Sequence, residues 1–130
     1  MLGGQNWAKV LRGMYGDVPA LWSSDLSPGD RRRFTINALT RMRFCDKAGR
    51  LDFSCSGPPG SQPRRLMPWF DFPQRRSRNW HIVFGHWSAL GVVRRDDITA
   101  LDSGCVWGRE LTAVPIEPDA KPTVVKCRDD

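Results

Sequence analysis

Short apolar runs that stop at a glycine or an aspartate occur repeatedly in the second half of the sequence. His81–Phe84 stops at Gly85, and residues 98–101 stop at Asp102. Residues 111–116 and 123–127 form two further runs of similar length. Runs of about four to six residues with such stops are typical of buried strands, whereas amphipathic helices need longer periodic segments. The second half therefore predicts a β-rich core.

The first half instead predicts a helix over residues 28–42. Ser27 can cap this helix, Pro28 suits its first position, and Asp30 completes a capping box. The apolar residues on one stripe of this helix are Phe34, Ala38 and Met42. The polar residues on another stripe, spaced four apart, are Arg33, Asn37 and Arg41. Helix and strands together predict an α/β fold.

Three segments follow from these patterns. Residues 1–53 should hold a short helix within 1–15, the helix just described, and a hairpin pairing 43–45 with 51–53. Residues 54–79 are rich in proline, glycine and arginine, and we expect them to form a loop. Residues 80–130 should form the β-rich half of a core.

The charge of the chain is strongly basic and unevenly distributed. It has 20 Lys and Arg against 14 Asp and Glu, a formal net charge of +6. Basic residues cluster in 31–50 and again in 64–78, and most of them are arginines. Such a field attracts polyanions, and the planar guanidinium matches phosphate oxygens. The alternative is a solvated basic surface with no ligand.

The four cysteines show no metal-binding spacing. Cys45, Cys55, Cys105 and Cys127 include no Cys-x-x-Cys pair, so a zinc site is not supported. No secretory signal and no membrane-spanning apolar run is visible. We therefore expect a cytoplasmic protein, no membrane partner, and cysteines that remain free thiols, mostly as small buried hydrophobes.

Two polar residues stand where predicted strands end. His86 follows Gly85 at the end of one run, and Asp102 directly follows another. Strand ends are good positions for presenting a side chain to a metal or a substrate. The alternative for His86 is a structural hydrogen bond, and for Asp102 a turn in which it bonds local backbone N–H groups.

An ordered set of short segments resembles a known enzyme family. The segments are Met14-Tyr15-Gly16-Asp17-Val18-Pro19, Trp22, Arg33-Phe34, Asn37 to Cys45, Pro68-Trp69-Phe70, Phe84 to Leu90, and Ala100 to Gly108. Together they resemble the C-terminal half of bacterial symmetrical bis(5′-nucleosyl)-tetraphosphatases, which are calcineurin-like metallophosphoesterases. The resemblance implies part of a β-sandwich flanked by helices, in a domain that this chain leaves incomplete.

The resemblance also implies a chemistry. The family enzyme is a hydrolase that splits the dinucleoside polyphosphate diadenosine tetraphosphate symmetrically into two ADP with two divalent metals, manganese or cobalt. His86 takes the role of a metal ligand, and Asp102 is a candidate for supporting it. Candidates for binding the substrate phosphates are Arg33, Asn37, Arg41 and Arg43. Tyr15 and Trp87 are candidates for stacking on a base, with core packing as the alternative.

The N-terminal motifs that supply most metal ligands in this superfamily do not occur in the sequence. Gly16-Asp17-Val18-Pro19 begins like one of them, but Pro19 stands where a histidine is needed. The chain has two histidines, and His81 lies an odd five residues before His86, so in one strand they would face opposite sides. We therefore expect this chain to supply about one ligand, to require a missing N-terminal half, and to be inactive by itself, with exposed edges that favour association.

Two alternatives stay open. A basic nucleic-acid-binding module would explain the +6 charge and the six tryptophans, which could stack on bases. Such a module should lose affinity when any of the clustered arginines is neutralised. The chain could also be an inactive remnant of the enzyme.

Overall fold

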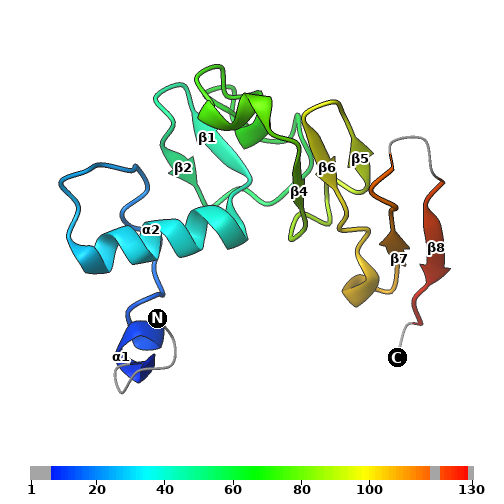
Figure 1. Cartoon of the computed structure of the whole chain (residues 1–130), viewed down its shortest axis with the longest axis horizontal. Coiled ribbons are helices and arrows are strands. Elements are labelled where there is room, and N and C mark those ends of the chain that lie inside the picture. The colour runs from blue at the N-terminus through cyan, green and yellow to red at the C-terminus, as the bar shows by residue number, and fades with distance from the viewer. Residues whose placement is uncertain (1–6, 118–120, 129–130) are drawn as a thin grey trace. The chain divides into compact units, whose positions relative to one another are not determined.

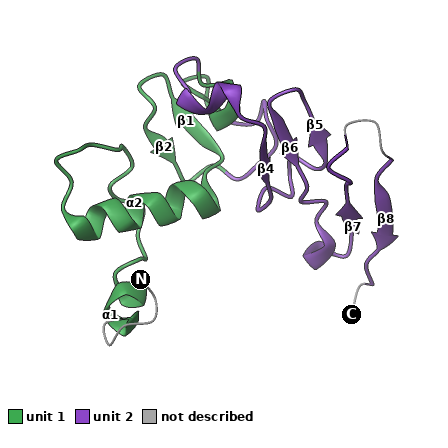
Figure 2. Ribbon diagram, viewed as in Figure 1, with its two compact units in different colours: residues 1–55, 63–72 green, residues 56–62, 73–130 purple. Residues whose placement is uncertain are grey.

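The computed structural model describes residues 7–117 and 121–128 of the chain. Figure 1 shows the elements in chain order. The chain forms two compact units, drawn in different colours in Figure 2. Unit 1 comprises the described residues of 1–55 together with 63–72, and unit 2 comprises 56–62 and the described residues of 73–130. Both helix and sheet are present, as the α/β prediction requires.

The helices of unit 1 are α1 (Trp7–Arg12) and α2 (Pro28–Arg41). The predicted start of α2 is confirmed: the Ser27 hydroxyl accepts from the backbone N–H of Asp30 at 3.2 Å and donates to its carboxylate at 2.8 Å. Proline stands in the first turn, where a missing N–H has no helical partner to lose. The helix predicted within 1–15 exists as α1, and residues 1–6 of that prediction lie outside the described residues.

The sheet of unit 1 has the strand order β2-β1-β3. β1 (Phe44–Asp46) and β2 (Leu51–Asp52) form the predicted hairpin, in which Gly49 has a φ of 80°, a value that glycine tolerates best. β3 (Leu66–Pro68) pairs with the other side of β1 and is followed by a 3₁₀ helix, η1 (Trp69–Asp71). The sequence predicted a loop here. An edge strand tolerates the proline that argued against a strand.

The core of unit 1 lies around this small sheet. Phe44 is 0% exposed and Cys45 3% exposed, so two of the three residues of the middle strand are buried. The other buried apolar residues of the unit are Leu51, Leu66, Trp69 and Phe70. α2 in contrast buries one residue along its length, the polar Asn37.

Unit 2 contains a three-stranded sheet in the order β4-β6-β5. β4 (Ile82–Phe84) is parallel to β6 (Ile98–Ala100), and β5 (Val93–Arg94) is antiparallel to β6. β6 is buried along its whole length, as its apolar run predicts. A short 3₁₀ helix, η2 (Arg76–Asn79), precedes β4 within the segment that was predicted to be a loop.

The remaining strands of unit 2 form an exposed hairpin. β7 (Glu110–Ala113) pairs antiparallel with β8 (Thr123–Lys126), at the two places where the sequence predicts strands. The prediction that these strands are buried is wrong, because every residue of β8 is exposed. A third 3₁₀ helix, η3 (Cys105–Trp107), lies just before β7.

Two of the four cysteines are not free thiols. Cys105 and Cys127 form a disulfide across 22 residues, with their Cα atoms 5.4 Å apart. The expectation of free thiols is therefore wrong for this pair, although Cys45 and Cys55 do remain free. The chain reversal between β7 and β8 brings Cys127 back beside η3, since its N–H donates to the carbonyl of Arg109 at 2.9 Å. Spacing along the sequence cannot reveal this approach.

In the described part of the chain, every helix is too short or too polar to cross a lipid bilayer.

Candidate functional site in unit 2

His86 lies just beyond the end of β4, as the sequence predicts. Its φ is 67°, in the left-handed region that residues with a Cβ atom rarely adopt. Gly85, which precedes it, does not have a positive φ, so the left-handed turn is made by His86 itself. Strained backbone of this kind is often found where a side chain must be held in one functional direction. The geometry therefore singles out His86 among the residues near the strand end.

A hollow of about 460 Å³ opens beside this residue. The parallel strands β4 and β6 both end there, and the N–H of Leu101 donates to the carbonyl of Phe84 at 2.9 Å. The carboxyl ends of parallel strands are the usual location of ligand sites in open α/β sheets. The residues lining the hollow are Val83, Phe84, Gly85, His86, Leu101, Asp102, Ser103, Gly104, Cys105, Glu110 and Leu111.

Asp102 shares the hollow with His86, so the two predicted strand-end residues do come together. One oxygen of its carboxylate accepts from the N–H of Gly104 at 3.1 Å. This bond is the local turn that the sequence left as the alternative. Asp102 thus stabilises the turn from residue 102 to residue 104 beside the hollow.

Glu110 is a second carboxylate at the hollow, and sequence reasoning missed it. Gly104 and Gly108 flank η3, both with positive φ, 81° and 72°, and the chain turns back there. Ser103 then donates to the backbone carbonyl of Glu110 at 2.6 Å. The two glycines are a sequence signal for a chain reversal. The sequence does not show that the strand after this reversal, β7, pairs with β8.

His81 has a structural environment. Its Nδ1 lies 3.1 Å from the carbonyl of Asp96, and its Nε2 lies 2.8 Å from the hydroxyl of Thr99. In the neutral ring Nδ1 must donate, because a carbonyl only accepts, and Nε2 then accepts from Thr99. Both ring nitrogens of His81 therefore have partners within unit 2.

The hollow does not contain a complete metal site. Among the described residues, no group of three or more His, Cys, Asp or Glu side chains is arranged to hold a metal ion. One imidazole beside two carboxylates, one of them bonded to backbone, does not fit the donor set of a two-metal centre. The residues that the structure describes therefore do not by themselves match the two metals that the resemblance implies.

The predicted phosphate-binding residues lie in unit 1, and the three on α2 (Arg33, Asn37 and Arg41) hold the segment 13–18. Arg33 donates to the carbonyl of Gly13 at 2.9 Å and to that of Val18 at 3.0 Å. It also forms an ion pair with Asp30 at 3.1 Å. Most of the donors of this guanidinium are therefore engaged within the chain.

Asn37 and Arg41 continue the same stripe of α2. Asn37 is 2% exposed and donates to the carbonyl of Gly16 at 2.8 Å, while its amide oxygen accepts from Arg41 at 3.2 Å. Arg41 also pairs with Asp17 at 2.9 Å and lies over the ring of Phe53, 4.7 Å from its centroid. The Arg41 side chain is partly exposed and faces an exposed carboxylate, so among these residues it is the most accessible to an anion.

Arg43 lies just before β1 and is half-buried. Its backbone carbonyl accepts from the N–H of Trp69 at 2.9 Å, which fixes the start of the sheet against η1.

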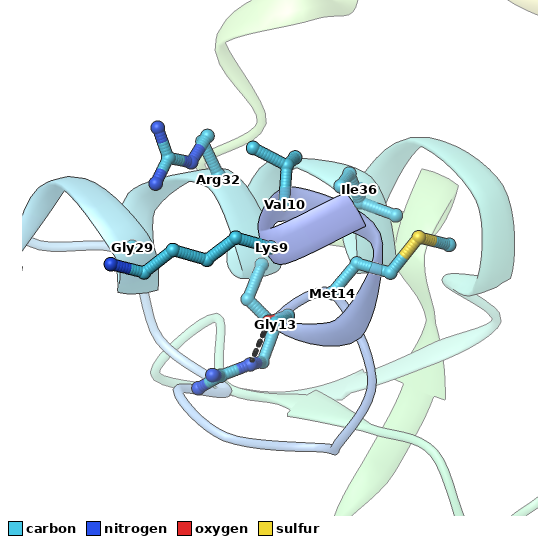
Figure 3. A pocket seen from close by; sticks show the side chains of 8 residues that line it. Lys9, Val10, Gly13, Met14, Gly29, Arg32 and Ile36 are labelled. Atoms are coloured by element: carbon cyan, nitrogen blue, oxygen red, sulfur yellow. Dashed lines mark hydrogen bonds between the residues drawn. The ribbon is translucent and has the colours of Figure 1, made fainter. Parts of the chain in front are cut away.

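A second, smaller hollow of about 220 Å³ lies in unit 1 and is shown in Figure 3. Lys9, Arg32 and Arg33 contribute positive charge to it, and Val10, Met14 and Ile36 contribute apolar surface. No sequence pattern pointed to this hollow.

The two candidates for base stacking have opposite environments. Tyr15 is 76% exposed, so its ring is open to a partner. Trp87 is 1% exposed, and its indole N–H donates to the carbonyl of Gly57 at 3.0 Å. The burial of Trp87 favours core packing, the alternative that the sequence left open.

The chain is similar to known enzymes over nearly its whole length. It is 48% identical over 127 residues to a protein of Bordetella pertussis named bis(5′-nucleosyl)-tetraphosphatase, symmetrical, covering 98% of this chain and 46% of that protein. Proteins of the same name from Burkholderia thailandensis and Methylococcus capsulatus are 49% identical over 114 residues and 58% identical over 106 residues. These matches cover 88% and 82% of this chain but 40% and 38% of the relatives.

These similarities confirm the resemblance that the sequence predicted. The chain spans less than half the length of the curated relatives it matches. No family model matches the chain.

Proposed function

We propose that this chain is part of a symmetrical bis(5′-nucleosyl)-tetraphosphatase, a hydrolase whose complete form converts diadenosine tetraphosphate into two ADP. The observation that carries this proposal is identity of 48% to 58%, over 82% to 98% of the chain, with relatives that bear this name. Identity at this level over so much of the chain leaves little room for a different fold. The hydrolysis adds water across the central phosphoanhydride, so that each product keeps two phosphates.

The fold that we propose is the C-terminal part of a calcineurin-like β-sandwich. β4 lies at the edge of its sheet, and Val83 within it is 60% exposed, whereas parallel strands are normally covered on both faces. Trp80 and Trp107 are 73% and 71% exposed in the same unit. Apolar surface of this kind is what an N-terminal half, present in the relatives and absent from this chain, would cover.

We propose that His86 donates one nitrogen to a metal whose other ligands lie in that missing half. The left-handed backbone and the position at the carboxyl ends of β4 and β6 support this role. Manganese and cobalt suit a mixed nitrogen and oxygen donor set. Because the donors among the described residues do not form a two-metal site, we expect the chain alone to be inactive.

We propose Arg41 as the residue most suited to the substrate phosphates. Its ion-pair partner Asp17 has a side chain that is 63% exposed. A polyphosphate could displace Asp17 from Arg41, because it offers several phosphate oxygens that accept strong hydrogen bonds. Arg33, Asn37 and Arg43 are proposed to hold the surrounding segments in place. We also propose a cytoplasmic location, where a nucleotide hydrolase meets its substrate.

Nucleic-acid binding is the alternative function. Four of the six tryptophans, Trp7, Trp22, Trp80 and Trp107, are at least half exposed, which would suit stacking on bases. An absent N-terminal half explains the same exposure. Binding of a single-stranded oligonucleotide with a steep salt dependence would favour this alternative.

The experiment that tests the proposed enzyme is a chimera. Residues 10–116 of this chain replace the matching part of the Methylococcus capsulatus relative, and products of diadenosine tetraphosphate are separated by chromatography. We expect ADP as the product, at a rate within tenfold of the parent enzyme. His86→Ala should abolish this activity, whereas His81→Ala serves as the matched histidine control and should retain a measurable rate. A folded chimera that releases AMP and ATP, or that is indifferent to His86→Ala, would contradict the proposal.

A further inference from the structure

A disulfide in unit 2 holds a part of the chain that is otherwise weakly attached. It joins Cys105 in η3 to Cys127, just after β8. β7 and β8 form a separate two-stranded sheet, to which a single parallel bridge between Gly104 and Glu110 is added, and an isolated two-stranded hairpin is marginally stable in water. Burial adds little, because Leu111, Val124 and Val125 are 62%, 48% and 59% exposed. The covalent link is therefore the strongest tie between the end of the hairpin and the rest of the unit.

Among the described residues, most of the hydrogen bonds that tie this hairpin to the rest of unit 2 lie near the disulfide. Cys127 donates its N–H to Arg109, and Ser103 donates to the carbonyl of Glu110 and accepts from Thr112 at 2.8 Å. At the far end, Arg94 donates to the carbonyl of Glu117 at 3.2 Å. The Ser103–Glu110 and Arg94–Glu117 bonds lie at the surface, where water competes for the same groups.

The disulfide also borders the hollow of His86. Cys105 lines that hollow together with Gly104 and Glu110, whereas the end of β4 supplies other lining residues. A change in the order of η3 and β7 would therefore change the shape of this wall directly. No element outside unit 2 is needed for this effect.

We propose that Cys105 and Cys127 are a redox-sensitive modification site, whose oxidation state sets the order of the β7–β8 hairpin and of the wall of the hollow next to it. Reduction by a dithiol breaks the Sγ–Sγ bond. The two sulfurs each gain one proton and one electron, and the dithiol becomes a cyclic disulfide. In a reducing compartment, where disulfides are usually transient, such a pair reports on redox state.

The other two cysteines give internal controls. Cys45 is 3% exposed within unit 1, and burial raises its thiol pKa to about 11, which keeps it in the unreactive protonated form. Cys55 is a free, half-buried thiol. Neither cysteine lies in the β7–β8 hairpin. Substituting Cys55 therefore tests for nonspecific effects of thiol removal.

The test is hydrogen exchange on the chain as it stands, read by mass spectrometry, before and after treatment with dithiothreitol. Alkylation under denaturing conditions should count two free thiols before treatment and four after it, in agreement with the paired and free cysteines. Reduction should speed amide exchange in residues 104–113 and 121–127 at least tenfold. Exchange in β6 should change less than twofold.

Two variants complete the experiment. Cys105→Ser with Cys127→Ser should reproduce the fast exchange without a reductant, and Cys55→Ser should exchange like the oxidised wild type. Four free thiols in the chain equilibrated in air would overturn the proposal. Unchanged exchange in the hairpin after full reduction would overturn it too. Neither result depends on nucleotide hydrolysis, so this inference and the proposed function can fail separately.

Discussion

Replacing Asn37 with alanine should destabilise unit 1 by about 2 kcal/mol, as the loss of a buried polar anchor predicts. Asn37 is 2% exposed and joins α2 to the carbonyl of Gly16 at 2.8 Å. Its amide oxygen accepts from Arg41 at 3.2 Å. One side chain thus connects the helix to the segment that precedes it by about twenty residues in the sequence.

The magnitude follows from the groups left behind. A net hydrogen bond contributes about 1 kcal/mol. Asn37→Ala removes two of them, one to the carbonyl of Gly16 and one from Arg41. Gly16 is exposed, so water can bond its carbonyl after the substitution, and Arg41 keeps its ion pair with Asp17. The expected loss is therefore about 2 kcal/mol. Asn37→Leu keeps the branched shape of the side chain but neither hydrogen bond, and should be similarly destabilising if hydrogen bonding is the cause.

Urea unfolding followed by circular dichroism at the helical band measures this change, because both α-helices of the described chain lie in unit 1. Leu39→Ala on the same helix is the control: Leu39 is 80% exposed, so its substitution should change stability by less than about 0.5 kcal/mol. An Asn37→Ala chain as stable as this control would refute the anchoring role.

Three further substitutions test the rest of the structure. Ser27→Ala removes the cap of α2 and should cost about 1 kcal/mol in the same urea assay, with no change expected if the cap were unimportant. Asp97→Ala removes the ion pair between Asp97 and the Arg75 side chain, which is 7% exposed, and should cost about 3 kcal/mol, measured by tryptophan fluorescence. Burial, with a smaller contribution from Asp46, raises the pKa of Cys45 from 9.0 to about 11, so the fold favours the protonated thiol. Stability should therefore be full below pH 9 and fall by about 2 to 3 kcal/mol by pH 11, and Cys45→Ala should remove that slope.

Local signals in the sequence predicted the parts of the fold that local chemistry decides. Ser27 and Asp30 mark the start of α2, because capping involves residues three positions apart. The β1–β2 hairpin follows from its glycine turn. His86 and Asp102 each follow a predicted strand, and both line the hollow where the parallel strands β4 and β6 end, although the sequence did not predict that these strands pair.

Features that depend on residues far apart in the sequence could not be predicted from it. The disulfide between Cys105 and Cys127 requires the β7–β8 reversal, and β3 requires β1 as a template. The stripe of Arg33, Asn37 and Arg41 was visible, but its carbonyl partners in the segment 13–18 were not. A spacing of four residues shows which side chains share a helix face, and says nothing about which groups they meet there.

The measurement that most directly tests the central claim is complementation between two separate chains. This chain, intact, is mixed at increasing ratios with the part of the Bordetella pertussis relative that it does not match, and ADP release from diadenosine tetraphosphate is followed with manganese present. We predict that neither chain alone releases ADP, and that activity rises to a plateau at one copy of each. Metal-dependent ADP release by this chain alone would contradict the account.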